Sequence, residues 1–111
     1  VIADGLVRDI DEAREFVFPV YARGTTARTA RGRVQQLRTN GPVEIGGQQV
    51  HPGDLVIADG SGVAFIRAED AERVLAAAER IAAKEGLMAK AVLDGKPISE
   101  VMGADYEHLL N

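Results

Sequence analysis

The sequence predicts a layered α/β domain in which a mixed sheet is followed by a long C-terminal helix. Short runs rich in Val, Ile and Leu, separated by tight glycine turns, occupy most of residues 1–66. From Ala68 onward the apolar residues recur with the period of a helix instead. A group of strands followed by a long helix is typical of layered α/β domains.

The length and composition of the chain fit one soluble domain. It has 111 residues, of which 46% are hydrophobic and 27% charged, and we treat residues 1–111 as a single domain. The absence of cysteine excludes disulfides, thiolate metal sites and cysteine nucleophiles. A net charge of −4 argues against nucleic acid as a partner. No apolar run approaches the roughly 20 residues of a membrane span and no signal peptide is visible, so we expect no membrane partner and a cytoplasmic location.

The first two elements are expected near the N-terminus. Residues 1–3 form an apolar strand that ends at Asp4-Gly5, which is a strong turn signal. Residues 9–15 predict one or two helical turns, with Asp9 or Asp11 as the N-cap.

Several short strands joined by turns are predicted in the middle of the chain. The expected strands are residues 16–22, 33–39, 42–45, 48–50, 55–58 and 63–66. Gly46-Gly47 separates two of them as a two-residue hairpin turn. A second turn, residues 59–62, joins two strands that we expect to be buried. Residues 23–32 are rich in Gly, Thr and Arg and predict a loop.

One long helix is predicted after these strands. Its apolar stripe, with helical spacing, consists of Ala71, Val74, Leu75, Ala78, Ile81 and Ala82. Acidic residues in its first turn and basic residues in its last suit the helix dipole. Gly86 is a candidate end, although residues 87–93 could continue the helix. Residues 94–111 predict a turn followed by short helical pieces.

The residues most suited to chemistry are the adjacent Arg8 and Asp9, which follow the first strand. A carboxylate beside a guanidinium at a strand end can hold a hard divalent cation and an anionic oxygen together. The pair could instead be a surface ion pair or an N-cap. We favour the functional interpretation, in which Asp9 ligates Mg²⁺ or Mn²⁺ and Arg8 holds a substrate oxygen. Asp4 is interpreted as a turn residue rather than a ligand.

Other polar residues are given structural roles. The stretch between Glu15 and Glu44 contains no acidic residue but has five arginines: Arg23, Arg28, Arg31, Arg33 and Arg38. We interpret them as a solvated face, with a cationic rim for a dicarboxylate substrate or a neighbouring subunit as the alternative. Two aspartates in glycine turns are expected to cap backbone donors; they are Asp54 and Asp59. Surface or packing roles are expected for His51 and His108.

Several stretches, taken in order, resemble one known family. They are Val1 to Asp9 (VIADGLVRD), Phe18 to Gly24 (FPVYARG), Val43 to Gly47, Val50 to Asp54 and Ala58 to Val63. Their order and rough spacing resemble the 4-hydroxy-4-methyl-2-oxoglutarate aldolase family, which includes the regulator of ribonuclease activity A and proteins described as demethylmenaquinone methyltransferase-like. The first stretch resembles the second half of the family's metal motif, whose first half lies upstream. The chain is therefore expected to be the carboxy-terminal half of this fold, with the amino-terminal half missing.

The resemblance implies a β/β/α swivelling-type layer and a divalent-metal-dependent lyase. Such an enzyme would cleave a C–C bond of a 4-hydroxy-2-oxo dicarboxylate, or decarboxylate oxaloacetate, and give pyruvate. Asp9 would hold Mg²⁺ or Mn²⁺, and Arg8 would be the catalytic and substrate-binding residue. The resemblance further implies a homotrimer or hexamer, completed by the missing half or by a second chain. The alternative is a non-catalytic regulator of the same fold that binds a protein; the intact Arg8-Asp9 pair favours the enzyme.

Overall fold

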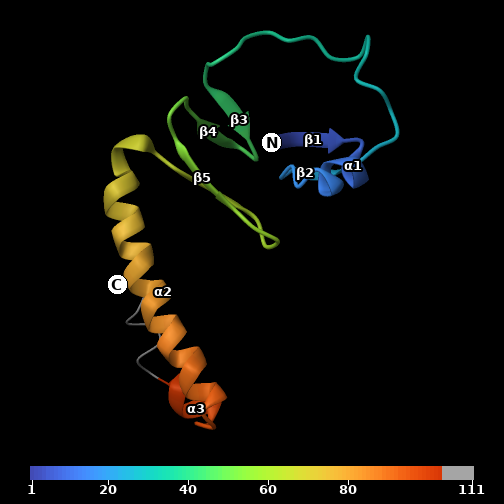
Figure 1. Ribbon diagram of the computed structural model, residues 1–111. Helices are drawn as coiled ribbons and strands as arrows, with labels where there is room; N and C mark the ends of the chain where they lie inside the picture. Colours follow the sequence, from blue (N-terminus) through green and yellow to red (C-terminus); the bar gives the residue numbers. More distant parts are fainter. Residues whose placement is uncertain (104–111) are drawn as a thin grey trace. The chain divides into compact units, whose positions relative to one another are not determined.

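The computed structural model describes residues 1–103 and contains two compact units, residues 1–68 and the part from residue 69 onward (Figure 1). The elements are β1 (Ile2–Val7), α1 (Ile10–Glu15), β2 (Tyr21–Thr25), β3 (Val43–Ile45), β4 (Gln48–Val50), β5 (Leu55–Ala58), β6 (Val63–Ile66), a 3-10 turn η1 (Ala68–Asp70), α2 (Ala71–Leu93) and α3 (Ile98–Val101). The predicted α/β class with a long C-terminal helix is confirmed. His108 lies outside the described residues.

The strands of the first unit form three two-stranded sheets. β1 pairs with β2 in parallel, and the short helix α1 makes the connection between them. β3 pairs with β4, and β5 with β6, in the antiparallel sense. Both strand directions of the predicted mixed sheet are therefore present, but within residues 1–103 they belong to separate sheets.

β1 does not stop at Asp4-Gly5, so the predicted turn at this point is wrong. The strand continues to Val7 and its pairing with β2 becomes irregular at these two residues. The register pairs that flank the irregularity are Ala3 with Ala22 and Leu6 with Gly24. β1 thus has one extra residue, because Asp4 and Gly5 together stand opposite Arg23 alone. This is a β-bulge, which kinks a strand without ending it.

The second strand is shifted from its predicted place, because α1 and its C-terminal cap take the first residues of the apolar stretch. Phe18 N–H donates to the carbonyl of Ala13 at 2.8 Å and Val17 N–H to that of Arg14 at 3.0 Å, which is a Schellman motif. Val17 takes the left-handed position of this motif with φ 53°. A β-branched residue is strained there, where glycine is usual.

β2 therefore begins only at Tyr21 and includes Arg23 to Thr25, which were predicted as part of a loop. The strand predicted at residues 33–39 is also wrong. The whole segment between β2 and β3 contains no helix or strand (residues 26–42).

The hairpin predicted at Gly46-Gly47 is confirmed. These residues have φ of 58° and 79°, as a primed two-residue turn between β3 and β4 requires. β5 and β6 also occupy their predicted residues. The expectation that both strands are buried is wrong: Leu55, Val56 and Ile57 of β5 are each more than a third exposed, and no residue of β6 is fully buried.

Two aspartates cap turns in this unit, as predicted. The carboxylate of Asp59 accepts from the backbone N–H groups of Ser61 and Gly62, at 2.7 and 3.2 Å. The carboxylate of Asp54 accepts from His51 N–H at 2.8 Å and Ala68 N–H at 3.1 Å. These backbone donors, His51 first, hold the pKa of Asp54 below its usual range.

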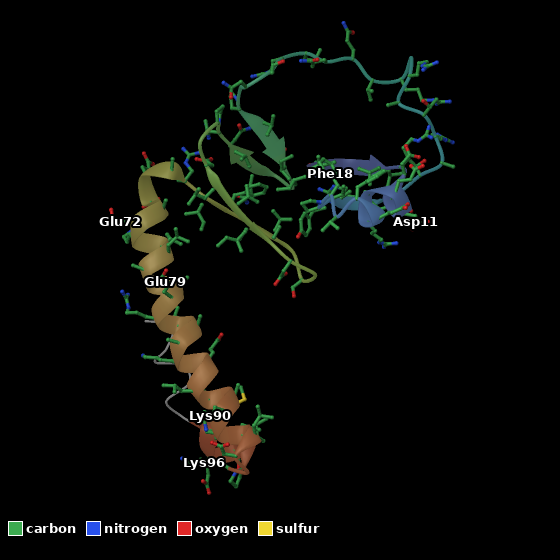
Figure 2. All side chains as sticks on the ribbon, viewed as in Figure 1. Asp11, Phe18, Glu72, Glu79, Lys90 and Lys96 are labelled. Carbon is green, nitrogen blue, oxygen red and sulfur yellow. The ribbon has the colours of Figure 1, made fainter. Side chains whose placement is uncertain are left out.

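The second unit consists mainly of α2. The helix continues through Gly86 to Leu93, so the candidate end at Gly86 is wrong and the alternative, continuation over residues 87–93, is confirmed. Asp94 is its C-cap residue, and the ammonium group of Lys90 lies 2.6 Å from the carboxylate of Asp94. Figure 2 shows Lys90 on the last turn of α2. α3 is one of the predicted short helical pieces.

The described residues contain no buried core. None of residues 1–103 is buried, whether hydrophobic or polar. Several large apolar side chains are mostly exposed, among them Phe16 (78%), Val17 (87%) and Leu93 (87%). Folded proteins normally bury many such side chains, so the exposed apolar surface of these residues is unusually large. No helix in the described part of the chain is long and apolar enough to cross a membrane.

The hairpin turn gives a first prediction. Gly47→Val should lower the free energy of unfolding by about 1 kcal/mol or more, because only glycine tolerates this positive φ well. Thermal unfolding followed by circular dichroism measures the change. Gly60→Val is the control, since Gly60 is in open space and does not have a positive φ. Equal melting temperatures for the two variants would contradict the turn assignment.

The strained cap of α1 gives a prediction of the opposite sign. Val17→Gly should raise the free energy of unfolding by about 1 kcal/mol, because it relieves a left-handed β-branched residue. Val34→Gly is the matched control: Val34 is also exposed (74%), but it is not among the residues with positive φ. Chemical denaturation distinguishes the two, and a Val17→Gly variant no more stable than wild type would refute the strain.

Candidate functional site

The predicted pair, Arg8 and Asp9, lies at the carboxyl end of β1. Val7 is the last residue of the strand and is in register with Thr25 of β2. The N–H group of Thr26 donates to the carbonyl of Val7 at 2.8 Å. The β1–β2 pairing therefore fixes the chain up to the residue immediately before Arg8.

Asp9 begins α1 with its backbone while its side chain stays outside the helix. Its carbonyl accepts the first helical hydrogen bond, from Ala13 N–H at 3.0 Å. Its backbone is left-handed, with φ 60° and ψ 38°, a conformation that aspartate adopts more readily than most residues. The carboxylate makes no capping hydrogen bond. Asp9 is thus the predicted N-cap residue by position, yet its carboxylate takes no part in capping the helix.

The side chains of Arg8 and Asp9 contact each other directly. Arg8 Nε donates to both carboxylate oxygens of Asp9, at 2.9 and 2.8 Å. Both side chains are about half exposed, 48% and 51%. A half-exposed ion pair holds its geometry only weakly, so it can rearrange around a cation or an anionic ligand. The structure therefore brings the two predicted residues together in an accessible position.

The donor set around Asp9 fits a hard cation better than zinc. Within residues 1–103 there is no group of three His, Cys, Asp or Glu side chains that could enclose a metal ion. Structural and catalytic zinc sites need three or four such ligands. Mg²⁺ is commonly held by one or two carboxylates, with water and substrate as its other ligands. A single half-exposed carboxylate after a strand end, paired only with the neighbouring Arg8 in the described part of the chain, is compatible with that second type of site.

A second ion pair, between Asp4 and Arg23, was missed by the sequence analysis. Asp4 Oδ1 accepts from Arg23 Nε, and Asp4 Oδ2 accepts from the backbone N–H of Gly46 at 2.9 Å. Arg23, followed by the Gly46 amide, holds the pKa of Asp4 below its usual range. Asp4 is therefore not a turn residue, and Arg23 faces an internal partner. The opposite charges of Asp4 and Arg23 were the feature of the sequence that could have indicated this ion pair.

The other arginines of the acid-free stretch are not gathered into a site. They lie in the irregular segment between β2 and β3, are exposed, and form no ion pair within the described part of the chain; they are Arg28, Arg31, Arg33 and Arg38. His51 has a surface position, with its ring beside Arg67 and 3.8 Å from the Asp54 carboxylate. These contacts fit the surface or packing role that was expected for His51.

A pocket of about 690 Å³ opens between the three sheets of the first unit. Its lining includes Asp4, Arg23 and Asp59, but neither Arg8 nor Asp9. The charged groups in it already bind one another or backbone amides. The rest of the lining is largely strand residues with apolar side chains. The pocket thus combines apolar side chains of the strands with polar groups of the turns.

Several known proteins are similar to this chain in sequence or in fold. A family model described as "RraA-like: Aldolase/RraA" matches residues 1–65. A relative from Halalkalibacterium halodurans, named "Putative 4-hydroxy-4-methyl-2-oxoglutarate aldolase", is 33% identical over 84% of this chain and 44% of its own length. An uncharacterized protein of Methanocaldococcus jannaschii is 29% identical over 95% of this chain and 50% of its own.

A solved structure has the same fold over most of the chain. It is the crystal structure of an uncharacterized protein from Pseudomonas syringae pv. tomato, with a TM-score of 0.82 and 28% identity. The match covers 89% of this chain and 50% of that one. The chain thus spans about half the length of these relatives.

Proposed function

The chain belongs to the RraA-like family of aldolase and RraA proteins, and from this membership we propose that it forms part of a divalent-metal-dependent lyase. The proposed substrate is a 4-hydroxy-2-oxo dicarboxylate or oxaloacetate, with pyruvate as a product. The name of the Halalkalibacterium relative supports an aldolase activity. The observation that carries the proposal is the accessible Arg8-Asp9 pair at the end of β1, with an Asp9 carboxylate that caps no helix.

Asp9 is the proposed ligand of Mg²⁺ or Mn²⁺. The cation, when bound, would act as a Lewis acid on the 2-oxo acid group of the substrate. The left-handed backbone of Asp9 directs the chain into α1 and leaves the carboxylate outside it. Because the carboxylate makes no capping hydrogen bond, binding a cation does not require the helix to lose its start.

Arg8 is the proposed substrate-binding and catalytic residue. Its Nε is used by Asp9, whereas its two terminal nitrogens make no hydrogen bond within residues 1–103. These terminal N–H groups can hold a substrate carboxylate in the planar fork that only arginine offers. The guanidinium would also stabilise the negative charge that develops on the oxo-acid fragment as the C–C bond breaks. The contact with Asp9 would orient this fork.

We also propose that a further segment completes this fold, either an amino-terminal half or a second chain, within a trimer or hexamer. None of residues 1–103 is buried, although a domain of this size normally has a hydrophobic core. The pocket between the three sheets has room for apolar side chains from such a segment. The relatives are about twice as long as the stretch they share with this chain.

The metal assignment predicts that Asp9→Ala abolishes divalent-metal-dependent release of pyruvate, because the one proposed protein ligand is lost. Lactate-dehydrogenase-coupled assays of the completed protein measure this release, with and without EDTA. Asp11→Ala is the control, since Asp11 is 94% exposed and pairs only with Arg14. Activity that survives Asp9→Ala, or that ignores EDTA, would refute the assignment; no activity even in wild type would favour a non-catalytic regulator.

The role of Arg8 predicts that Arg8→Lys lowers turnover by on the order of 10²-fold while metal affinity changes little. Lysine keeps the charge but loses the planar fork. Arg14→Lys, on the exposed face of α1, is the matched control. Steady-state kinetics and a Mn²⁺ titration separate the two effects. An Arg8→Lys enzyme as fast as wild type would reduce Arg8 to a structural partner of Asp9.

The assembly proposal predicts that the 111-residue chain is aggregated or inactive when it is expressed alone. Its exposed apolar side chains would associate with each other in the absence of their partner. Sedimentation velocity, combined with an activity assay, tests this directly. A folded, active monomer would contradict the proposal.

A further inference from the structure

The β-bulge in β1 sets the position of everything that follows it in the strand. Across the bulge, β1 advances by three residues while β2 advances by two. A shift of one residue moves each later side chain to the opposite face of a strand. Arg8 and Asp9 follow this bulge directly, so their placement relative to β2 depends on whether the bulge forms.

The carboxylate of Asp4 lies within the bulge and contacts both neighbouring elements. One oxygen accepts from Arg23 Nε, on the strand opposite the bulge. The other accepts from the N–H of Gly46, the first turn residue of the β3–β4 hairpin, at 2.9 Å. Both oxygens of the carboxylate are therefore paired in the bulged register, in which Asp4 and Gly5 stand opposite Arg23.

The register beyond the bulge leads directly to the proposed site. Leu6 pairs with Gly24, where a Cβ atom on residue 24 would meet the Leu6 side chain at 3.2 Å. Val7 pairs with Thr25 and accepts from Thr26 N–H. The next residue is Arg8. Two register pairs and one hydrogen bond thus connect the Asp4 contacts to the Arg8-Asp9 pair.

We infer that Asp4 is a positioning residue of the Arg8-Asp9 site, which it sets in register by holding the bulge against Arg23 and the Gly46 amide. This inference rests on the proposed function for its chemical meaning, because Asp4 itself touches neither Arg8 nor Asp9. A partly exposed ion pair contributes little to stability. Loss of Asp4 should therefore damage the geometry of the site more than the stability of the fold.

The test is a Mn²⁺ titration of the completed protein, followed by electron paramagnetic resonance, beside thermal unfolding. Asp4→Asn keeps an oxygen for the Gly46 amide but leaves Arg23 unneutralised, and it should weaken Mn²⁺ binding about tenfold or more. Asp59→Asn is the matched control, because Asp59 also caps backbone amides and lines the same pocket. Its melting temperature should fall as much as that of Asp4→Asn, with Mn²⁺ affinity unchanged.

Variants of Arg23 provide a second, independent test of the inference. Arg23→Gln should weaken Mn²⁺ binding as Asp4→Asn does, and Arg23→Lys should restore part of it by restoring the charge. The double variant D4N/R23Q should be no weaker than either single variant, because both substitutions remove the same interaction. Additive losses, or an Asp4→Asn protein with wild-type affinity, would overturn the inference.

Amide hydrogen exchange separates this inference from the proposed function. In Asp4→Asn, the Thr26 amide that donates to Val7 should exchange about tenfold faster, while the Asp59 amide, which donates to Gly62, should not change. A wild-type protein that binds no Mn²⁺ would refute the proposed metal site, yet faster Thr26 exchange would still support control of the register by Asp4. An unchanged Thr26 amide would overturn that control whatever the metal result.

Discussion

The carboxylate of Asp4 joins parts of the first unit that no backbone pairing joins. Its strands form three separate two-stranded sheets, so hydrogen bonds within the sheets cannot hold the sheets together. Asp4 links the β1–β2 pair to the turn of the β3–β4 hairpin. The hydroxyl of Tyr21 links the β1–β2 pair to the third sheet, because it donates to the carbonyl of Ala58 at 2.9 Å. In residues 1–103, where no residue is buried, these polar contacts connect the three sheets.

The elements that depend on local chemistry could be predicted from the sequence. The Gly46-Gly47 turn follows from the positive φ that two adjacent glycines accept. The start of α2 follows from its apolar spacing. The predictions were wrong where distant partners or backbone details decide the outcome. Asp4-Gly5 has the residues of a turn, but it lies in a strand opposite Arg23. Val17 occupies a helix-cap position that is normally taken by glycine. The helix does not end at Gly86, because a glycine inside a helix lowers the stability of the helix by only about 1 kcal/mol.

The candidate site could likewise be predicted only in those parts that depend on local sequence. Arg8 and Asp9 could be located because an arginine beside an aspartate after a strand is a local pattern, and the structure places the two side chains in contact. The bulge that sets their register could not be predicted, because it exists only in relation to β2. The left-handed backbone of Asp9 was likewise hidden from residue type alone. A short motif can thus identify candidate residues, while their position relative to the neighbouring strand depends on contacts elsewhere in the chain.

The irregular segment between β2 and β3 has a consequence for limited proteolysis and for changes in chain length. It carries four exposed arginines and no helix or strand over residues 26–42, so trypsin should cut there before it cuts the sheets. Adding residues to such a loop costs little entropy, since the closure penalty grows only with the logarithm of length. Forms with a lengthened loop should therefore keep the pairing within β1–β2 and within the hairpins. By contrast, deletion of a single residue from the bulge would leave the loop intact and misdirect Arg8 and Asp9.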